Sequence, residues 1–593
     1  MTRKALIIRT AEELPSQTDL SGSDSSSSGP LRAGTAELIG YATAAIVGTA
    51  LIVVAAYTQP YNQNEIQQIA PYGTGDISKI IHATRQPPID PLLGAAVEHV
   101  FGVGQLRQRL VPVIAGIVML IVMSLILRRL RIGYAGVVAA WAMAISPLLI
   151  RYSGYARPYA LPLMLMLVYV YAAMMFEETR HRRWLVVLGL SAVAMPATRV
   201  PEPNVFLGVT LIFTVWRLWR GRLPRHLAIP LIAVPAVAIA AVGYPLFRVL
   251  AHQSSKIFDL SPSGFVRRFP HGVHEVFTGF LPLMSHYTPW WPLLVVAVVA
   301  VVAIPSARRC LAEWWFFWPL LAAPVVFALA YHFLNPFSFE VRPYRTRMAI
   351  FFVPAITLLV AALCAPLVAA AKQWSVRSRA ILGTFVAALV LSQLPATANV
   401  LTKKEAPDFQ QAAQVLTHDL SPHAIVLYDT VSVAGQWRQP FSGIPRYMGD
   451  VPFVGQVSTL MRHPRTVPLS GPVLVLLLDS PCSTSVVCDG VKVPWDGKVP
   501  GWHVKKRFDR FTLYAPDQKL VGRDGVVQAM TTWGQDLTPA YGYPETYVAA
   551  SLLKQMGEAA QGKALIARML TNAGDERAAI EKTAAKRRMD PFQ

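Results

Sequence analysis

Six arginines stand directly beside the ends of long apolar stretches in this 593-residue chain. They are Arg151, Arg157, Arg199, Arg342, Arg345 and Arg347. One explanation is that their charged ends extend to lipid headgroups while their apolar stems stay buried. Several arginines at one membrane face also suit an anionic ligand, most simply a phosphate. A guanidinium is always charged and binds phosphate oxygens in pairs.

The polar segment between the first two apolar stretches, residues 58–107, includes the carboxylates Glu65, Asp76 and Asp90. A carboxylate within hydrogen-bond reach of a hydroxyl can take its proton as a general base. Each of the three also has a simpler interpretation. Glu65 suits an exposed carboxylate at headgroup height, whereas Asp76 and Asp90 suit caps of helices that begin beside them.

The other polar residues give weaker signals. The histidines His82, His271, His274 and His286 have no convincing metal-ligand spacing, although His271 and His274 lie near Glu275. We therefore predict no metal and no cofactor. Cys482 and Cys488 are close enough for a small disulfide loop if their region is extracytoplasmic, and are two free thiols otherwise.

The composition indicates a membrane protein. The chain is 53% hydrophobic and 15% charged, against about 25% charged residues in soluble domains. Its mean hydropathy is +0.39. The net charge of +21 would suit nucleic-acid binding in a soluble protein, but here the basic residues cluster between apolar runs as topology signals do. We predict no nucleic-acid partner.

A membrane-spanning helix needs about 20 apolar residues. Reading the chain for such runs predicts about eleven spans: 36–57, 108–127, 133–150, 159–176, 184–198, 204–219, 227–247, 289–305, 313–333, 347–369 and 380–395. With the N-terminus inside, the connections on the cytoplasmic side are much shorter than those on the other side but carry about as many basic residues. The positive-inside rule therefore predicts a cytoplasmic N-terminus and an extracytoplasmic C-terminal part, in a cell (inner) membrane.

Four segments follow from this pattern. Residues 1–35 are expected to be a disordered cytoplasmic leader, and 36–400 a transmembrane domain. Residues 401–530 are expected to be an extracytoplasmic α/β domain. In it, Ala424–Asp429 and Val473–Asp479 form buried strands and His503–Ala515 an edge strand. Residues 531–593 are expected to be a helical tail. The fold class is thus an α-helical polytopic membrane protein with a C-terminal α/β domain.

The sequence resembles the GT-C glycosyltransferases related to protein O-mannosyltransferases and lipid A aminoarabinose transferases (glycosyltransferase family 39-like). The matching segments, in order, are Asn64–Glu65, Gln86–Leu93, Phe101–Leu110, Ser146–Ala160 and Arg345–Pro354. Two positions depart from the family pattern. Asn64 stands where the relatives have an acid that is usually catalytic, and Gln86 stands where they have a histidine.

The resemblance implies transfer of a sugar from a polyprenyl-phosphate donor to an extracytoplasmic lipid, glycan or protein, by inverting displacement. Glu65 is then the expected base and Asp76 the second choice. Arg345 and Arg347, followed by Arg157 and Arg151, are expected to bind the donor phosphate. The remaining expected residues line the sugar and acceptor cleft: Tyr152, Tyr159, Gln86 and Asp90. Tyrosines at this height also suit an aromatic belt.

Two other functions stay open. A transporter or flippase of a lipid-linked sugar would need charged or helix-breaking residues at the bilayer midplane and often paired repeats, of which the sequence shows little. A non-catalytic assembly partner of an envelope enzyme is compatible with Asn64.

Overall fold

A computed structural model gives the structure of the protein. It describes residues 30–253, 305–334, 349–403 and 409–592, with short gaps inside these ranges and longer ones at 430–452, 457–466 and 479–498. Several expected features therefore lie outside the described residues. They are the 1–29 part of the leader, Asn64, Gln86, His271, His274, His286, Arg342, Arg345, Arg347, Cys482 and Cys488.

The part before residue 404 is helical. Its longer helices are α1 (Pro30–Thr58), α6 (Leu110–Arg129), α7 (Tyr134–Ala144), α9 (Ala160–Thr179), α10 (Arg182–Thr198), α11 (Pro201–Trp219), α12 (Arg225–Ala238), α17 (Phe317–Leu334) and α19 (Val353–Ala371). Shorter elements are α3 (Ile77–Thr84), α4 (Ile89–Phe101), α5 (Gln105–Gln108), α8 (Pro147–Ser153), the π-helix η2 (Ile239–Gly243), α13 (Tyr244–Gln253), α16 (Pro305–Glu313), the 3₁₀ helix η4 (Ile350–Phe352) and α21 (Leu394–Thr402).

Within the described residues, five helices are long and apolar enough to cross a membrane, or seven if two bent helix pairs each count as one span. The helical membrane architecture expected from the sequence is confirmed to this extent. The count of eleven stays a prediction, since the expected span 289–305 lies almost wholly outside the described residues.

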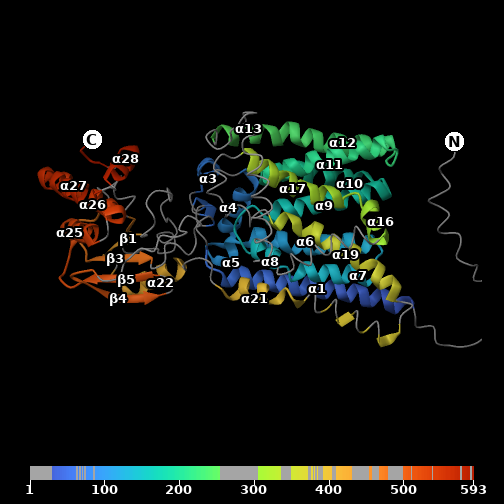
Figure 1. The fold of residues 1–593 in the computed structure, drawn as a ribbon, viewed down its shortest axis with the longest axis horizontal. Helices are drawn as coiled ribbons and strands as arrows, with labels where there is room; N and C mark the ends of the chain where they lie inside the picture. The colour runs from blue at the N-terminus through green and yellow to red at the C-terminus, as the bar shows by residue number, and fades with distance from the viewer. Residues whose placement is uncertain are drawn as a thin grey trace, which may run out of the picture.

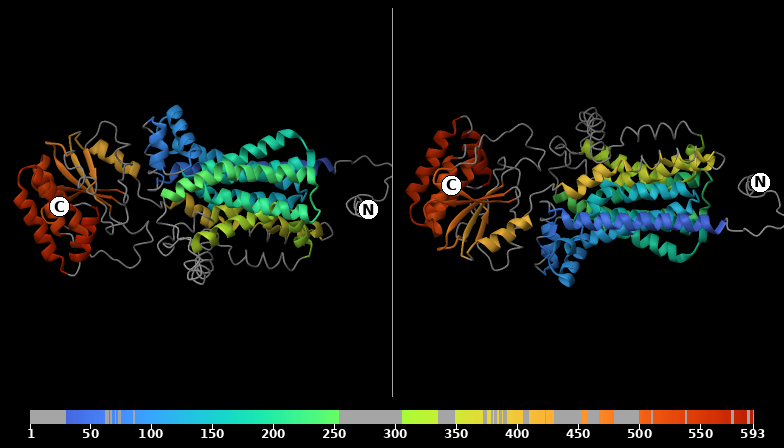
Figure 2. Two further views of the ribbon diagram at one scale, coloured as in Figure 1. Left: turned by 90° about the horizontal axis from the view of Figure 1, so that it is seen from above. Right: turned by 90° about the horizontal axis from the view of Figure 1, so that it is seen from below.

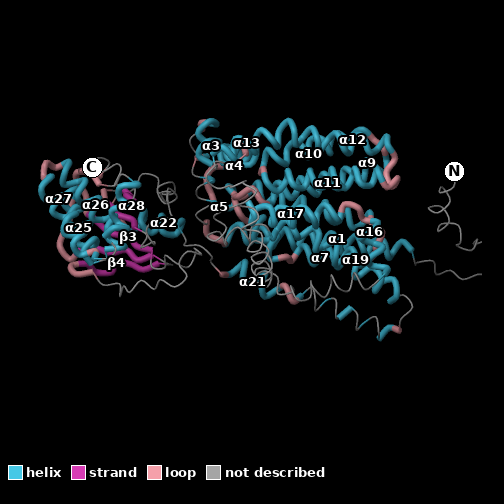
Figure 3. The backbone as a smooth tube through the Cα atoms, turned by 45° about the horizontal axis from the view of Figure 1, so that its top comes forward, coloured by secondary structure: helices cyan, strands magenta, loops and turns pink. Residues whose placement is uncertain are grey.

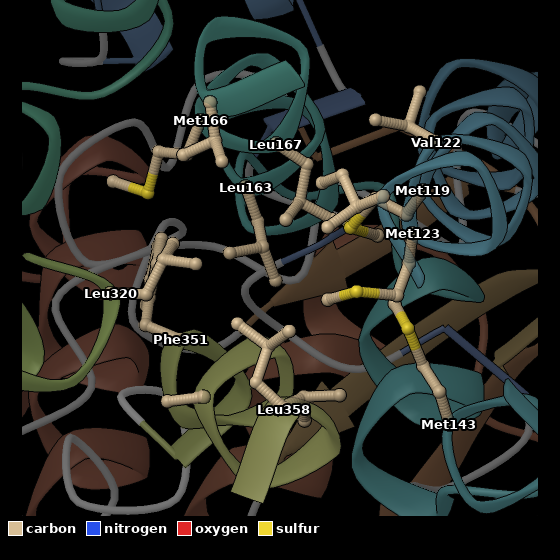
Figure 4. Packing of buried hydrophobic residues seen from close by; sticks show 14 of the residues in the cluster. Met119, Val122, Met123, Met143, Leu163, Met166, Leu167, Leu320, Phe351 and Leu358 are labelled. Atoms are coloured by element: carbon tan, nitrogen blue, oxygen red, sulfur yellow. The ribbon is translucent and has the colours of Figure 1, made fainter. Parts of the chain in front are cut away.

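The helices pack through small residues and interlocking apolar side chains. A Cβ atom added at Gly116 of α6 would lie 2.6 Å from Ser153 Cβ of α8 and 3.0 Å from Ile52 Cδ1 of α1. Such residues let helix backbones approach closely where lipid supplies no hydrophobic drive. Around Met123, Leu163 and Leu358, side chains of several helices interdigitate (Figure 4).

A break in one expected span places the residues after it. The stretch 133–150 forms α7 and α8, which meet at an angle of 52°. Ser146 is extended, as the residue before a proline prefers, and Pro147 begins α8. The bend turns the chain so that α8 carries Arg151 and Tyr152 at the end of the bundle.

The two ends of the bundle differ. The short helices α3, α4 and α5 lie at the end from which the C-terminal domain extends, and α1 begins at the opposite end (Figures 1 and 2). The loop 58–107 and the C-terminal domain thus lie toward the same end.

The C-terminal domain contains a mixed five-stranded sheet in the order β2-β1-β3-β5-β4. Its strands are β1 (Ile425–Asp429), β2 (Phe453–Gln456), β3 (Val473–Leu478), β4 (Trp502–Phe508) and β5 (Phe511–Pro516). β1 pairs in parallel with β2 and β3, with Ile425 opposite Phe453 and Val473. β5 is antiparallel to β3 and β4. β1 and β3 occupy the two apolar runs expected to be buried strands.

The expectation of one edge strand over 503–515 is wrong, because this stretch contributes two antiparallel strands. β4 is at the edge, and its residues 503–507 are exposed. In β5, Phe511, Thr512, Leu513 and Tyr514 are all buried, because β5 lies between β3 and β4. A continuous buried run is typical of an interior strand.

Helices cover the sheet. They are α22 (Phe409–Asp419), α25 (Gly522–Asp536), α26 (Pro539–Gln555), α27 (Ala559–Asn572) and α28 (Arg577–Arg587), grouped around the strands in Figure 3. Trp533 of α25 packs edge-on against Trp502 and Tyr514 of the sheet. The boundary expected at residue 530 falls inside α25.

Candidate active site

A fully buried ion pair lies where the first loop joins the bundle. Glu65 and Arg109 are each 0% exposed and form two parallel hydrogen bonds, from Nε to Oε1 and from Nη2 to Oε2, both 2.9 Å. The backbone N–H of Ala156 also donates to Glu65 Oε1 over 2.8 Å. Both carboxylate oxygens therefore already have charged or fixed donors.

Arg109 also binds the end of α1. Its Nη1 donates to the carbonyls of Ala56 and Gln59 over 2.8 and 2.6 Å, and its Nη2 donates to Pro60 O over 3.1 Å. With the two bonds to Glu65, all five donors of the guanidinium are used. The ring of Tyr61 lies under it, 4.6 Å from the guanidinium carbon. The pair thus joins α1, the first loop, the start of α6 and the loop after α8.

A second buried carboxylate lies nearby in the first turn of α4. Asp90 is 5% exposed, and its Oδ2 accepts a hydrogen bond from the side-chain amide of Gln68. Gln68 in turn accepts at Oε1 from Arg157 Nη1 over 3.3 Å. Among the described residues, Oδ1 of Asp90 accepts no hydrogen bond. Asp90 is therefore less completely bonded than Glu65.

Burial controls the protonation of this group. Removal from water raises the pKa of Asp90 to about 6, because burial disfavours the charged form. The hydrogen bond from Gln68 and the charges of Arg157 and Arg199 act in the opposite direction but do not cancel the effect of burial.

Arginines and tyrosines from α8, the loop after it and the end of α10 complete the cluster. Arg151 Nε donates to the hydroxyl of Tyr155 over 3.1 Å. Tyr152 is buried between Tyr155 and Tyr159, with ring centres 5.7 and 5.2 Å away. The guanidinium of Arg199 lies 4.7 Å from the centre of the Tyr159 ring.

Arg199 also pairs with Glu202 over 2.5 Å, at the turn between α10 and α11. Two elements far apart in sequence therefore bring three arginines, Arg151, Arg157 and Arg199, to the same end of the bundle as Asp90. A cluster of this charge can hold an anion beside a carboxylate.

The structure accounts for the other expected residues as follows. Asp76 caps α3, since its Oδ1 accepts from the N–H of Ser78 over 3.0 Å, as the simpler interpretation proposed. Glu65 bonds to Ala156, and Asp90 is connected through Gln68 to Arg157, so both carboxylates lie near the loop after α8. The described residues hold no group of three or more metal-ligating side chains. The roles of Glu65 as base and of Tyr152 and Tyr159 in the cleft stay predictions.

Two central residues were not singled out from the sequence as site residues. Arg109 immediately precedes the apolar run of α6, in the position that drew attention to the other six arginines. That position was a usable signal. Gln68 carries no charge and belongs to no motif, so nothing in the sequence distinguishes it from neighbouring glutamines.

Residues 85–246 match the family model described as dolichyl-phosphate-mannose-protein mannosyltransferase. The predicted family resemblance is confirmed over this segment. It includes Asp90, Arg109, Arg157 and Arg199, while Glu65 and Gln68 precede it. No curated protein matches the chain.

Two crystal structures of ArnT from Cupriavidus metallidurans are similar to this chain. The structure bound to undecaprenyl phosphate matches this chain with a TM-score of 0.48 and 14% sequence identity. The match covers 80% of this chain and 97% of the ArnT chain. The apo structure matches with a TM-score of 0.48 and 15% sequence identity. That match covers 81% of this chain and 98% of the ArnT chain.

Proposed function

We propose that this protein is a membrane glycosyltransferase that moves a sugar from a polyprenyl-phosphate donor to an acceptor hydroxyl. The observation that carries the proposal is the cluster of the buried Asp90 with the half-buried Arg151, Arg157 and Arg199, within the segment that matches the mannosyltransferase family model. That family, dolichyl-phosphate-mannose-protein mannosyltransferase, supports a lipid-phosphate sugar as donor and a protein as one class of acceptor. Lipid and glycan acceptors are equally compatible with the cluster.

The chemistry has two requirements that the cluster can meet. In an inverting displacement, the acceptor oxygen bonds to the anomeric carbon while the bond from that carbon to the phosphate oxygen breaks. The bond electrons leave with the lipid phosphate, and the acceptor proton goes to a carboxylate base. Arginines directed at the departing phosphate stabilise its growing charge.

We place Arg157 and Arg151 at the phosphate, together with Arg345 and Arg347 as the sequence proposes. No metal is required in this scheme, because arginines supply the positive charge. The proposed orientation puts the N-terminus in the cytoplasm and the site and C-terminal domain on the extracytoplasmic side of the cell membrane.

The test is transfer of radiolabelled sugar from a panel of polyprenyl-phosphate sugars into envelope extract by the purified protein. We expect product with one donor, and at least a tenfold loss in the Arg157→Gln variant. Arg568→Gln, in α27 of the C-terminal domain, is the matched control. Movement of labelled lipid across liposomes without any transfer would overturn the proposal in favour of a flippase. Inactivity with every donor, together with stoichiometric recovery of an envelope transferase, would favour the assembly partner.

A further inference from the structure

Two buried carboxylates of the first loop, Glu65 and Asp90, lie near the loop that carries Arg157, and an inverting displacement needs one base. We propose that Asp90 takes the acceptor proton, and that Glu65 is a positioning residue that acts through Arg109 and Ala156. This inference rests on the proposed function and assigns its central residue.

The bonding of Glu65 argues against proton transfer. Three N–H donors hold its two oxygens at 2.8–2.9 Å, and two of these donors belong to a cation. Both residues are 0% exposed, so an acceptor hydroxyl would have to displace Arg109 or the Ala156 N–H to reach either oxygen. A carboxylate whose two oxygens are already bonded in this way is poorly placed to take a proton from an acceptor.

Asp90 differs in each of these respects. Its one hydrogen-bond donor is the neutral amide of Gln68, which leaves Oδ1 available to an incoming hydroxyl. Burial raises the pKa of Asp90 to about 6, closer to the pH at which a base must accept and release a proton. The neighbouring residue of Glu65 in the sequence, Asn64, carries an amide and cannot serve as a base.

Gln68 links the base to the phosphate subsite. It donates to Asp90 and accepts from Arg157, so one side chain holds both groups in fixed relation. A phosphate at Arg157 would offset the positive charge that now lowers the pKa of Asp90. Donor binding therefore makes Asp90 a stronger base, which couples proton removal to the presence of the leaving group.

The reaction then balances as follows. The acceptor oxygen forms its bond to the anomeric carbon as the carbon–phosphate oxygen bond breaks. The acceptor proton moves to Oδ1 of Asp90, and the bond electrons leave on the lipid phosphate. Asp90 returns its proton to solvent when the products depart.

The test compares full-length wild type with Asp90→Asn, Asp90→Glu and Glu98→Gln in the transfer assay. Glu98 is the matched control, a carboxylate of the same helix that is 7% exposed and bonded to Gln108. We expect kcat to fall about 100-fold or more in Asp90→Asn. We also expect unchanged binding of unsubstituted polyprenyl phosphate, partial recovery of kcat in Asp90→Glu, and near-normal Glu98→Gln.

The pH dependence of the wild type separates a base from a structural residue. We expect kcat/KM to fall on the acid side of about pH 6, and kcat to fall at a higher pH, since kcat reports the donor-bound enzyme. Undiminished transfer by Asp90→Asn, or a loss equalled by Glu98→Gln, would overturn the assignment while the proposed function stands. No transfer by wild type would overturn both.

Discussion

Glu65 and Asp90 belong to one loop but have different hydrogen-bond partners. Glu65 is bonded to a buried cation, Arg109, and to the backbone N–H of Ala156. Asp90 has an amide. The first arrangement depends on the charge of the carboxylate, whereas the second tolerates its loss. The sequence shows two acidic residues and cannot show this difference, because it arises from contacts 44 and 22 residues away.

Glu65→Gln is expected to destabilise the protein by about 3–5 kcal/mol, because it leaves Arg109 buried without a counter-ion. The double variant Glu65→Gln/Arg109→Met should recover part of the loss, since it removes the stranded charge. Thermal unfolding of the purified proteins in detergent measures both. A Glu65→Gln variant as stable as wild type would show that the pair is not needed for folding.

Asp90→Asn is expected to raise the unfolding temperature at pH 7.5. The pKa of Asp90 is about 6 in the folded protein, above its ordinary value of 3.8. The contribution of Asp90 to stability is therefore present below pH 3.8 and is lost as the pH rises through about 6. Two pKa units correspond to about 3 kcal/mol at most. The advantage of the variant should shrink between pH 7.5 and pH 5. An advantage independent of pH would contradict this account.

At the scale of elements, the apolar runs predicted helices and buried strands, because burial follows directly from residue type. The break of 133–150 at Ser146–Pro147 follows the preference of a residue before proline for extended backbone. The apolar pattern alone did not predict it. The burial of β5 and the exposure of β4 depend on β5 pairing with strands on both sides, and a local sequence pattern does not contain that information. The cluster around Asp90 depends likewise on how α4 meets the loop after α8.

Gly116→Ala is expected to separate α6 from α8 and reduce transfer several-fold, because a Cβ there would lie within 2.6 Å of Ser153. Gly208→Ala is the matched control, since its Cβ in α11 would meet nothing within 4 Å. An alanine at that helix position should be neutral or slightly stabilising. Activity and unfolding temperature measure both variants. Equal behaviour of the two would show that the close approach at Gly116 does not position α8.

The whole molecule places its N-terminal helix end and its C-terminal domain at opposite ends of the bundle (Figure 1). With the native cysteines replaced, a cysteine at Leu469, which is 78% exposed, should react with an impermeant thiol reagent added to intact spheroplasts. A cysteine at Trp219, which is 76% exposed at the end of α11, should react only after permeabilisation. The reverse pattern would invert the proposed orientation.

The bonds between Glu65 and Arg109 close a ring in the chain, as a covalent cross-link between these residues would. Its ends are fixed to α1 and α6, so residues 66–108 cannot swing away as a free arm hinged at one end. Ordering this loop costs less entropy once its ends are held together. The proposed lipid donor and its acceptor would therefore enter by displacement within the ring, where α3 and α4 lie, or by movement of the chain that faces it.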